Sequence, residues 1–103
     1  MSKNPLELLT GDPVELSILT FKARMMMVLT QLIRERKLSQ SEAAEMLNVT
    51  QPRISNLMNG KISKFSVDML MEMLGRFGYL MDLSFDPSAV DNPIAVGVKK
   101  STV

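Results

Sequence analysis

The stretch NVTQPRISNLMNG, residues 48–60, decides the fold of the chain. Thr50 is a typical N-cap residue, Pro52 is tolerated in a first helical turn, and Gly60 ends a helix. The helix that these residues predict has an apolar side, formed by Val49, Ile54, Leu57 and Met58. Its polar side chains fall on the other side and are Gln51, Arg53, Ser55, Asn56 and Asn59. The apolar side can pack on a core, so the polar side is left to face outward.

The residues before this stretch predict another short helix, over residues 40–47. Ser39 and Glu42 have the S-x-x-E spacing of a capping box, in which each side chain bonds the backbone of the other residue. Asn48 follows the helix at a position that needs positive φ, a conformation that Asn tolerates well. Two short helices joined by three or four residues, the second polar on its outer side, are the parts of a helix-turn-helix.

In a helix-turn-helix the second helix enters the major groove of DNA and offers its outward side chains to base edges. We therefore predict base contacts from Gln51, Pro52, Arg53, Ser55 and Asn56. We predict phosphate contacts, which position the protein without specifying a sequence, from Ser39, Gln40, Thr50, Asn59, Lys61 and Lys64. The alternatives are a helix side that is merely solvated, Ser39 and Thr50 acting only as caps, and lysines that only increase solubility.

The flanking sequence predicts two further helices and one strand. Asp12 and Pro13 start a long helix whose apolar surface is too wide for one buried stripe. Ser66 starts another, which ends near Gly78. Residues 79–85 then alternate with period two and predict a strand. We see no second good strand, so we expect this one to pair with its copy across a two-fold axis, through Tyr79, Met81, Leu83 and Phe85.

The predicted fold class is therefore all-α, with about five helices and a short C-terminal strand that pairs across a dimer. We assign residues 1–11 to an N-terminal arm, residues 12–86 to the DNA-binding domain with its dimerisation strand, and residues 87–103 to a tail. Residues 94–98 resemble a weak edge strand but are included in that tail.

Composition narrows the classes of function. The chain has 103 residues, no cysteine and no histidine, which removes disulfides, the usual zinc sites and Ser-His or Cys-His catalysis. We therefore expect no enzyme activity, no metal and no cofactor. Residues 34–64 hold six basic and three acidic side chains, a net of +3, and the remaining residues hold six and eight, a net of −2. Positive charge thus concentrates around the predicted DNA-binding helices.

The sequence also predicts a soluble cytoplasmic protein. The first residues lack the basic region and apolar run of a signal peptide. The longest apolar-rich stretch, residues 14–33, is interrupted by Glu15, Lys22 and Arg24, which disfavours a membrane span.

Residues 38–61 resemble the lambda-repressor-like, or Cro/C1-type (XRE family), helix-turn-helix. The family pattern is met by Gln40, Ala44, Asn48, Val49, Ile54 and Leu57. Asn48 is a departure, because Gly is commoner there. Residues 16–85 resemble more narrowly the HigA-type antitoxins of bacterial toxin–antitoxin operons. This resemblance implies a homodimeric repressor that binds a palindromic operator in double-stranded DNA and neutralises a RelE/HigB-like RNase toxin. The alternative is a stand-alone or phage-derived XRE-family regulator without a toxin partner.

Overall fold

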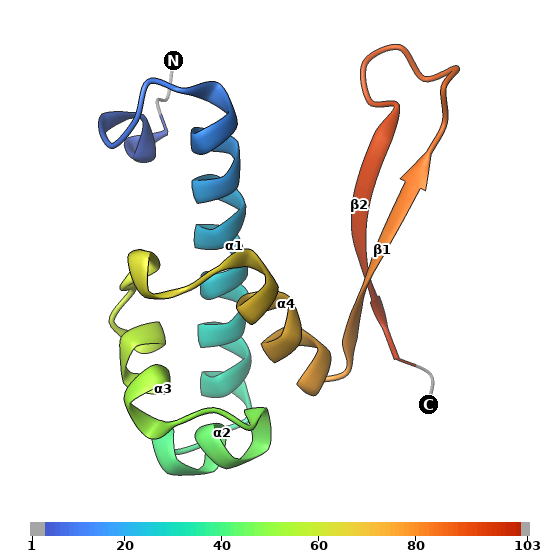
Figure 1. The fold of residues 1–103 in the computed structure, drawn as a ribbon. Helices are drawn as coiled ribbons and strands as arrows, with labels where there is room; N and C mark the ends of the chain where they lie inside the picture. The colour runs from blue at the N-terminus through green and yellow to red at the C-terminus, as the bar shows by residue number, and fades with distance from the viewer. Residues whose placement is uncertain (1–3, 102–103) are drawn as a thin grey trace.

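A computed structural model describes residues 4–101 and shows a small helical domain followed by a β-hairpin (Figure 1). The elements, in chain order, are η1 (Pro5–Leu8), α1 (Pro13–Glu35), α2 (Gln40–Leu47), α3 (Gln51–Met58), η2 (Ile62–Lys64), α4 (Val67–Arg76), β1 (Tyr79–Phe85) and β2 (Ile94–Lys100). Within the described range there are thus four α-helices, and η1 and η2 are short 3-10 turns. The prediction of about five helices is corrected to four.

The predicted helix starts are confirmed by hydrogen bonds at each N-terminus. The Asp12 carboxylate accepts from the Val14 amide at 3.0 Å, and Thr50 Oγ1 accepts from the Arg53 amide at 3.3 Å. At α2 the capping box is complete, because Ser39 Oγ accepts from the Glu42 amide while Glu42 Oε1 accepts from the Ser39 amide. These bonds satisfy amides that the first helical turn leaves without a partner.

The turn between α2 and α3 has the backbone that the sequence predicts. Asn48 adopts φ 55° and ψ 46°, the left-handed conformation that ends α2, and its amide donates to carbonyls of α2. Gly60, after α3, has φ 67°. Both positions favour residues that accept positive φ.

The core lies where all four helices meet, with α1 as the long central element (Figure 1). Its most completely buried side chains are Leu29, Ile33, Leu47, Ile54, Leu57, Leu70 and Met73. Met25 and Met26 are also buried there, so methionines fill part of the core volume. By length and composition alone α1 could cross a membrane. In this fold, however, its buried side packs in the core of the bundle.

The strand Tyr79–Phe85 is confirmed, but the expectation that it lacks a partner in its own chain is wrong. β2 pairs with it antiparallel over seven residues, from Tyr79 opposite Lys100 to Phe85 opposite Ile94. Residues 94–100, assigned to a tail, are therefore a strand. The turn between the strands is held by bonds at Asp86, whose amide donates to the Pro93 carbonyl at 2.7 Å and whose Oδ1 accepts from the Ser88 amide at 3.0 Å. The chain itself thus pairs one edge of β1.

The described part of the N-terminal arm is more ordered than expected. Residues Pro5–Leu8 form a 3-10 turn, capped by the Asn4 side chain. The Asn4 amide nitrogen also donates to Thr20 Oγ1 at 2.6 Å, which ties the arm to α1. The predicted arm covers residues 1–11, and its first three residues lie outside the described range.

Candidate nucleic-acid interface

The outer side of α3 is polar and accessible. Ile54 and Leu57 are 0% and 1% exposed and fix the inner side of the helix on the core. Gln51 and Pro52 are exposed, while Ser55 and Asn56 are half-buried. No polar side chain in residues 4–101 falls in the buried class. The structure therefore leaves the predicted base-contacting side chains open to solvent.

Arg53 lies differently from the other predicted base contacts. An α-helix turns by about 100° per residue, which puts Arg53 beside Leu57, on the flank of α3. Pro52, Ser55 and Asn56 lie farther round, on the side opposite the core. Arg53 is half-buried there. That position suits a phosphate as well as a base.

The hydroxyl groups around α3 keep a hydrogen to donate. A hydroxyl has one donor and two acceptor sites. Thr50 Oγ1 acts as the acceptor in its cap, so its hydrogen remains available, whereas the Ser39 hydroxyl both accepts from the Glu42 amide and bonds the Glu42 carboxylate. Ser55 Oγ likewise accepts from Asn59 Nδ2 at 3.5 Å, one turn along the helix. Acting as a cap is thus compatible with donating to a phosphate or a base.

The N-terminus of α2 carries one charge that opposes an anion. Backbone and side-chain hydrogen bonds from Ser39 hold the pKa of Glu42 below its ordinary value, so this carboxylate stays ionised. Both Ser39 and Gln40 are exposed beside it. A phosphate at this end must therefore be held by neutral donors and by the helix dipole rather than by positive side chains.

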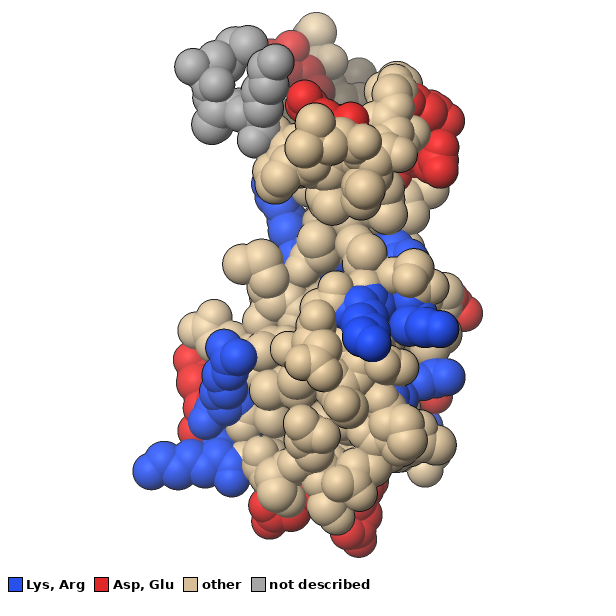
Figure 2. All heavy atoms as spheres, turned by 90° about the vertical axis from the view of Figure 1, so that its left-hand side faces the viewer, with Lys and Arg blue, Asp and Glu red and all other residues tan. Residues whose placement is uncertain are grey.

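Basic side chains flank α3 rather than cover it. Lys61 and Lys64 are exposed on the segment that follows the helix. Figure 2 shows this side of the molecule, with Lys and Arg to the left and right of a neutral central area. In such a layout the neutral area can contact base edges in a groove, while the basic side chains on either side contact the phosphates of the two DNA strands. Ser63, exposed between the two lysines, is a further donor that sequence reasoning missed, because a lone Ser in a loop carries no pattern.

One residue of the basic stretch is used inside the fold. The Arg36 guanidinium stacks on the Phe77 ring, 4.7 Å from its centroid, and donates to the Phe77 carbonyl at 3.4 Å. It therefore ties the end of α1 to the end of α4. The net charge of +3 counted along residues 34–64 overstates the positive charge that can face DNA.

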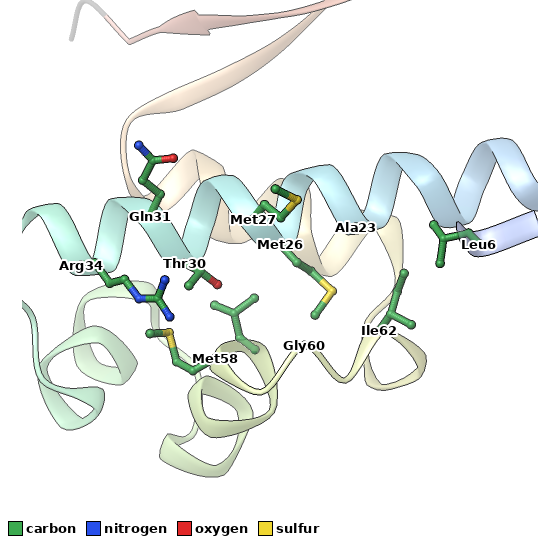
Figure 3. A pocket seen from close by; sticks show the side chains of 11 residues that line it. Leu6, Ala23, Met26, Met27, Thr30, Gln31, Arg34, Met58, Gly60 and Ile62 are labelled. Atoms are coloured by element: carbon green, nitrogen blue, oxygen red, sulfur yellow. The ribbon is translucent and has the colours of Figure 1, made fainter. Parts of the chain in front are cut away.

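An apolar groove lies behind α3, between its C-terminal end and α1 (Figure 3). The groove encloses about 530 Å³, and its walls include Met26 and Met27 of α1, Met58 of α3, and Ile62. Arg34 reaches its margin beside Met58. The groove shares the wall residue Leu57 with the core. Across residues 4–101, no cluster of three metal-ligating side chains is present.

Comparison with known proteins adds one match. The model of a family described as a helix-turn-helix domain matches residues 12–85, which is most of the chain. The match includes α1 to α4 and β1. No curated protein sequence matches the chain.

Proposed function

The chain belongs to this family of helix-turn-helix domains, and on that premise we propose that it is a sequence-specific, DNA-binding transcriptional repressor. The observation that carries the proposal is the two-sided character of α3. Ile54 and Leu57 anchor one side in the core, while Gln51, Ser55 and Asn56 remain accessible on the other. A helix so anchored can enter a major groove as a rigid body without uncovering the core.

The outward side chains have the chemistry that base edges require. Gln51 and Asn56 carry amides that pair with N6 and N7 of adenine, and Arg53 pairs with O6 and N7 of guanine or with a phosphate. Ser55 donates or accepts, and the Pro52 ring contacts a thymine methyl. Each good pairing contributes about 1–3 kcal/mol of discrimination against the wrong base.

Residues around α3 hold the backbone of the duplex. Lys61 and Lys64 neutralise phosphates. Further phosphates accept hydrogen bonds from the neutral side chains of Ser39, Gln40, Thr50 and Asn59. Neutralising phosphates releases counterions, so binding weakens as salt is raised. The Ser63 hydroxyl is a further hydrogen-bond donor to these phosphates.

Two copies bind a palindromic operator. In a helix-turn-helix dimer the recognition helices enter successive major grooves roughly 34 Å apart. Placed over a promoter, such a dimer blocks RNA polymerase. From the sequence we assign dimerisation to Tyr79, Met81, Leu83 and Phe85. The repressor acts in the cytoplasm, needs no cofactor or metal and is not an enzyme.

A fluorescence anisotropy titration tests this function. The ligands are a duplex from the DNA upstream of the protein's own gene and a duplex of the same length with scrambled sequence. Specific binding is expected to be tighter than non-specific binding by at least about 10³-fold at physiological salt. Equal affinity for the two duplexes would refute sequence-specific repression.

The repressor is more narrowly an antitoxin that regulates its own operon and neutralises a RelE/HigB-like RNase toxin. Support comes from the resemblance of residues 16–85 to the HigA-type antitoxins and from the charge at the N-terminal end. Glu7, Asp12 and Glu15 are exposed there, and Figure 2 shows acidic side chains at this end of the molecule as well as at the opposite end. An acidic end suits a basic, RNA-binding partner.

Co-expression with the product of the neighbouring gene separates this reading from its alternative. A stable complex that suppresses RNase activity is expected of an antitoxin. A chain that binds its operator but forms no complex is instead a stand-alone or phage-derived regulator of the XRE type.

A further inference from the structure

The hairpin has one mainly apolar side and one side of mixed character. Because side chains alternate along each strand and the pairing has no bulge, the residues on one side are Tyr79, Met81, Leu83, Phe85, Ile94, Val96 and Val98, with Lys100 at its end opposite Tyr79. The opposite side carries an ion pair between Asp82 and Lys99, with Oδ2 and Nζ 3.5 Å apart. The apolar side is the one that faces α1, because Tyr79, Met81 and Val98 line a cavity together with Phe21 and Val28.

On this apolar side only two residues of β1 are partly covered by the rest of the chain, and Val98, opposite the second of them, is 50% exposed. Tyr79 and Met81 are half-buried. Farther along, Leu83 is 70% exposed and Phe85 69%, and on the paired strand Ile94 is 60% and Val96 55% exposed. Figure 1 shows why, since the hairpin diverges from α1 as it runs from α4 toward its turn.

The N-terminal half of α1 forms the other wall of the gap. Val14 is 66% and Ile18 47% exposed. Ile18 and Phe21 line a cavity of about 720 Å³ that Val96 also borders, so the two walls face a common space. We call Val14, Ile18, Leu83, Phe85, Ile94 and Val96 the apolar wedge.

We propose that the apolar wedge is the contact surface between two copies of this chain, each copy placing its diverging hairpin against the α1 wall of the other. This inference rests on the proposed function, which requires a dimer, and it identifies the surface that makes one. In this dimer the apolar side of both strands makes the contact, whereas the sequence predicts a contact through the backbone edge of β1. Tyr79 and Met81 are no longer part of the contact, since their own subunit already partly covers them.

The size of the wedge favours a second copy as the occupant. A standard interface buries about 800 Å² on each partner. Six large apolar side chains at half exposure present on the order of 100 Å² each, so the wedge supplies most of that area. A contiguous apolar surface of this size is uncommon on a protein that stays monomeric.

The position of the wedge also suits a two-fold dimer. A two-fold contact uses the same patch on both copies, and the wedge carries both a projecting hairpin and the α1 wall that receives it. Figure 1 shows the hairpin and α3 on opposite sides of α1. Two copies joined through their wedges therefore keep α3 free for DNA.

Sedimentation velocity over a dilution series of the full chain tests the proposal. The wild type is expected to sediment as a dimer, and Phe85→Asp and Val96→Asp as monomers with an unchanged far-UV circular dichroism spectrum. Ser84→Asp is the matched control, because Ser84 lies on β1 but on the opposite side, and it should remain dimeric. A monomeric wild type, or dimeric Phe85→Asp and Val96→Asp variants, would overturn the proposal.

A second measurement does not depend on how the aspartate variants fold. The chain has no cysteine, so a Leu83→Cys variant and a Ser84→Cys variant each carry one thiol. With a maleimide reagent, labelling of Leu83→Cys is expected to slow several-fold as the protein concentration rises, while labelling of Ser84→Cys keeps its rate. Equal rates at all concentrations would show that the wedge is not covered by a second copy.

Failure of this inference and failure of the proposed function give different results. A wild type that prefers its operator but stays dimeric after Phe85→Asp retains the repressor and refutes the wedge. A dimer that Phe85→Asp dissociates but that shows no preference for any duplex retains the wedge and refutes the repressor.

Discussion

Single side chains on and beside α3 have two different roles in this account. Those on its outer side, such as Gln51, distinguish base pairs, and those on the following segment, such as Lys61, neutralise phosphates. Loss of the first kind should reduce specificity, while loss of the second should weaken binding to every duplex. The two effects are separable because they depend differently on DNA sequence and on salt.

Replacing Gln51 with Ala should remove one base contact. We expect the affinity for the operator to fall by about 1–3 kcal/mol, roughly 5- to 150-fold, with little change for a scrambled duplex. Anisotropy titrations with both duplexes measure this difference. The matched control is Gln31→Ala, an exposed residue of α1 that bonds Glu35 rather than facing outward from α3. Equal losses for both duplexes would show that Gln51 does not read bases.

Replacing Lys61 with Ala should lower the affinity for all duplexes alike. We expect the slope of log affinity against log salt to decrease by about 1, because one phosphate contact is lost. The control is Lys99→Ala, which removes the same charge from a hairpin residue paired with Asp82. A slope that changes equally in both variants would contradict a local phosphate contact at Lys61.

At the scale of elements, the helices could be predicted from sequence and the hairpin only in part. Each helix begins at a residue whose side chain caps it, and these local bonds are visible as sequence spacings. The sequence predicts only a weak edge strand in the tail where β2 lies, because Gly97 weakens a strand and β2 has no buried side of its own. Pairing with β1 depends on the Asp86 turn, which the sequence pattern did not reveal.

The candidate site could also be predicted from sequence only in part. The outward residues of α3 can be predicted from Ile54 and Leu57 alone. These two residues mark the buried side, and the helical period then places every other side chain around the axis. The use of Arg36 against Phe77 could not be predicted, since it joins residues 41 positions apart. Only part of the apolar wedge could be predicted from sequence, because Leu83 and Phe85 lie on the predicted strand whereas Ile94 and Val96 lie on β2.

The turn between α2 and α3 offers a test at this scale. Asn48 has φ 55°, a conformation that costs a residue with an ordinary side chain about 1–2 kcal/mol. Asn48→Ala should therefore lower the free energy of unfolding by about 1 kcal/mol, while Asn48→Gly should leave it nearly unchanged. Urea denaturation followed by circular dichroism measures both. Equal stability of the two variants would argue against a left-handed turn.

At the scale of the whole molecule, stability should respond to acid but not to pH changes near neutrality. Hydrogen bonds from Ser39, Ser66 and Ser88 hold the pKa values of Glu42, Asp68 and Asp86, respectively, below their ordinary values. Lowered folded-state values mean that these groups stabilise the fold above their unfolded pKa and lose that contribution as pH falls through the folded one. The chain has no histidine, whose titration would fall near neutrality.

We therefore expect the thermal midpoint to stay level between about pH 6 and pH 8 and to fall below about pH 4. In Glu42→Gln the fall in acid should be smaller, because one of the three carboxylates no longer titrates. Calorimetry across this range measures both chains. A midpoint that drops between pH 8 and pH 6 would require a titrating group other than these carboxylates.

The exposed side of α3 remains the centre of the whole account, and selection from a pool of random DNA duplexes tests it most directly. Wild-type protein should enrich one palindromic motif whose half-sites lie about one helical turn apart. A variant with Gln51, Ser55 and Asn56 all changed to Ala should fold, bind duplexes without preference and enrich none. Enrichment of the same motif by both proteins, or of no motif by the wild type, would contradict reading of DNA by α3.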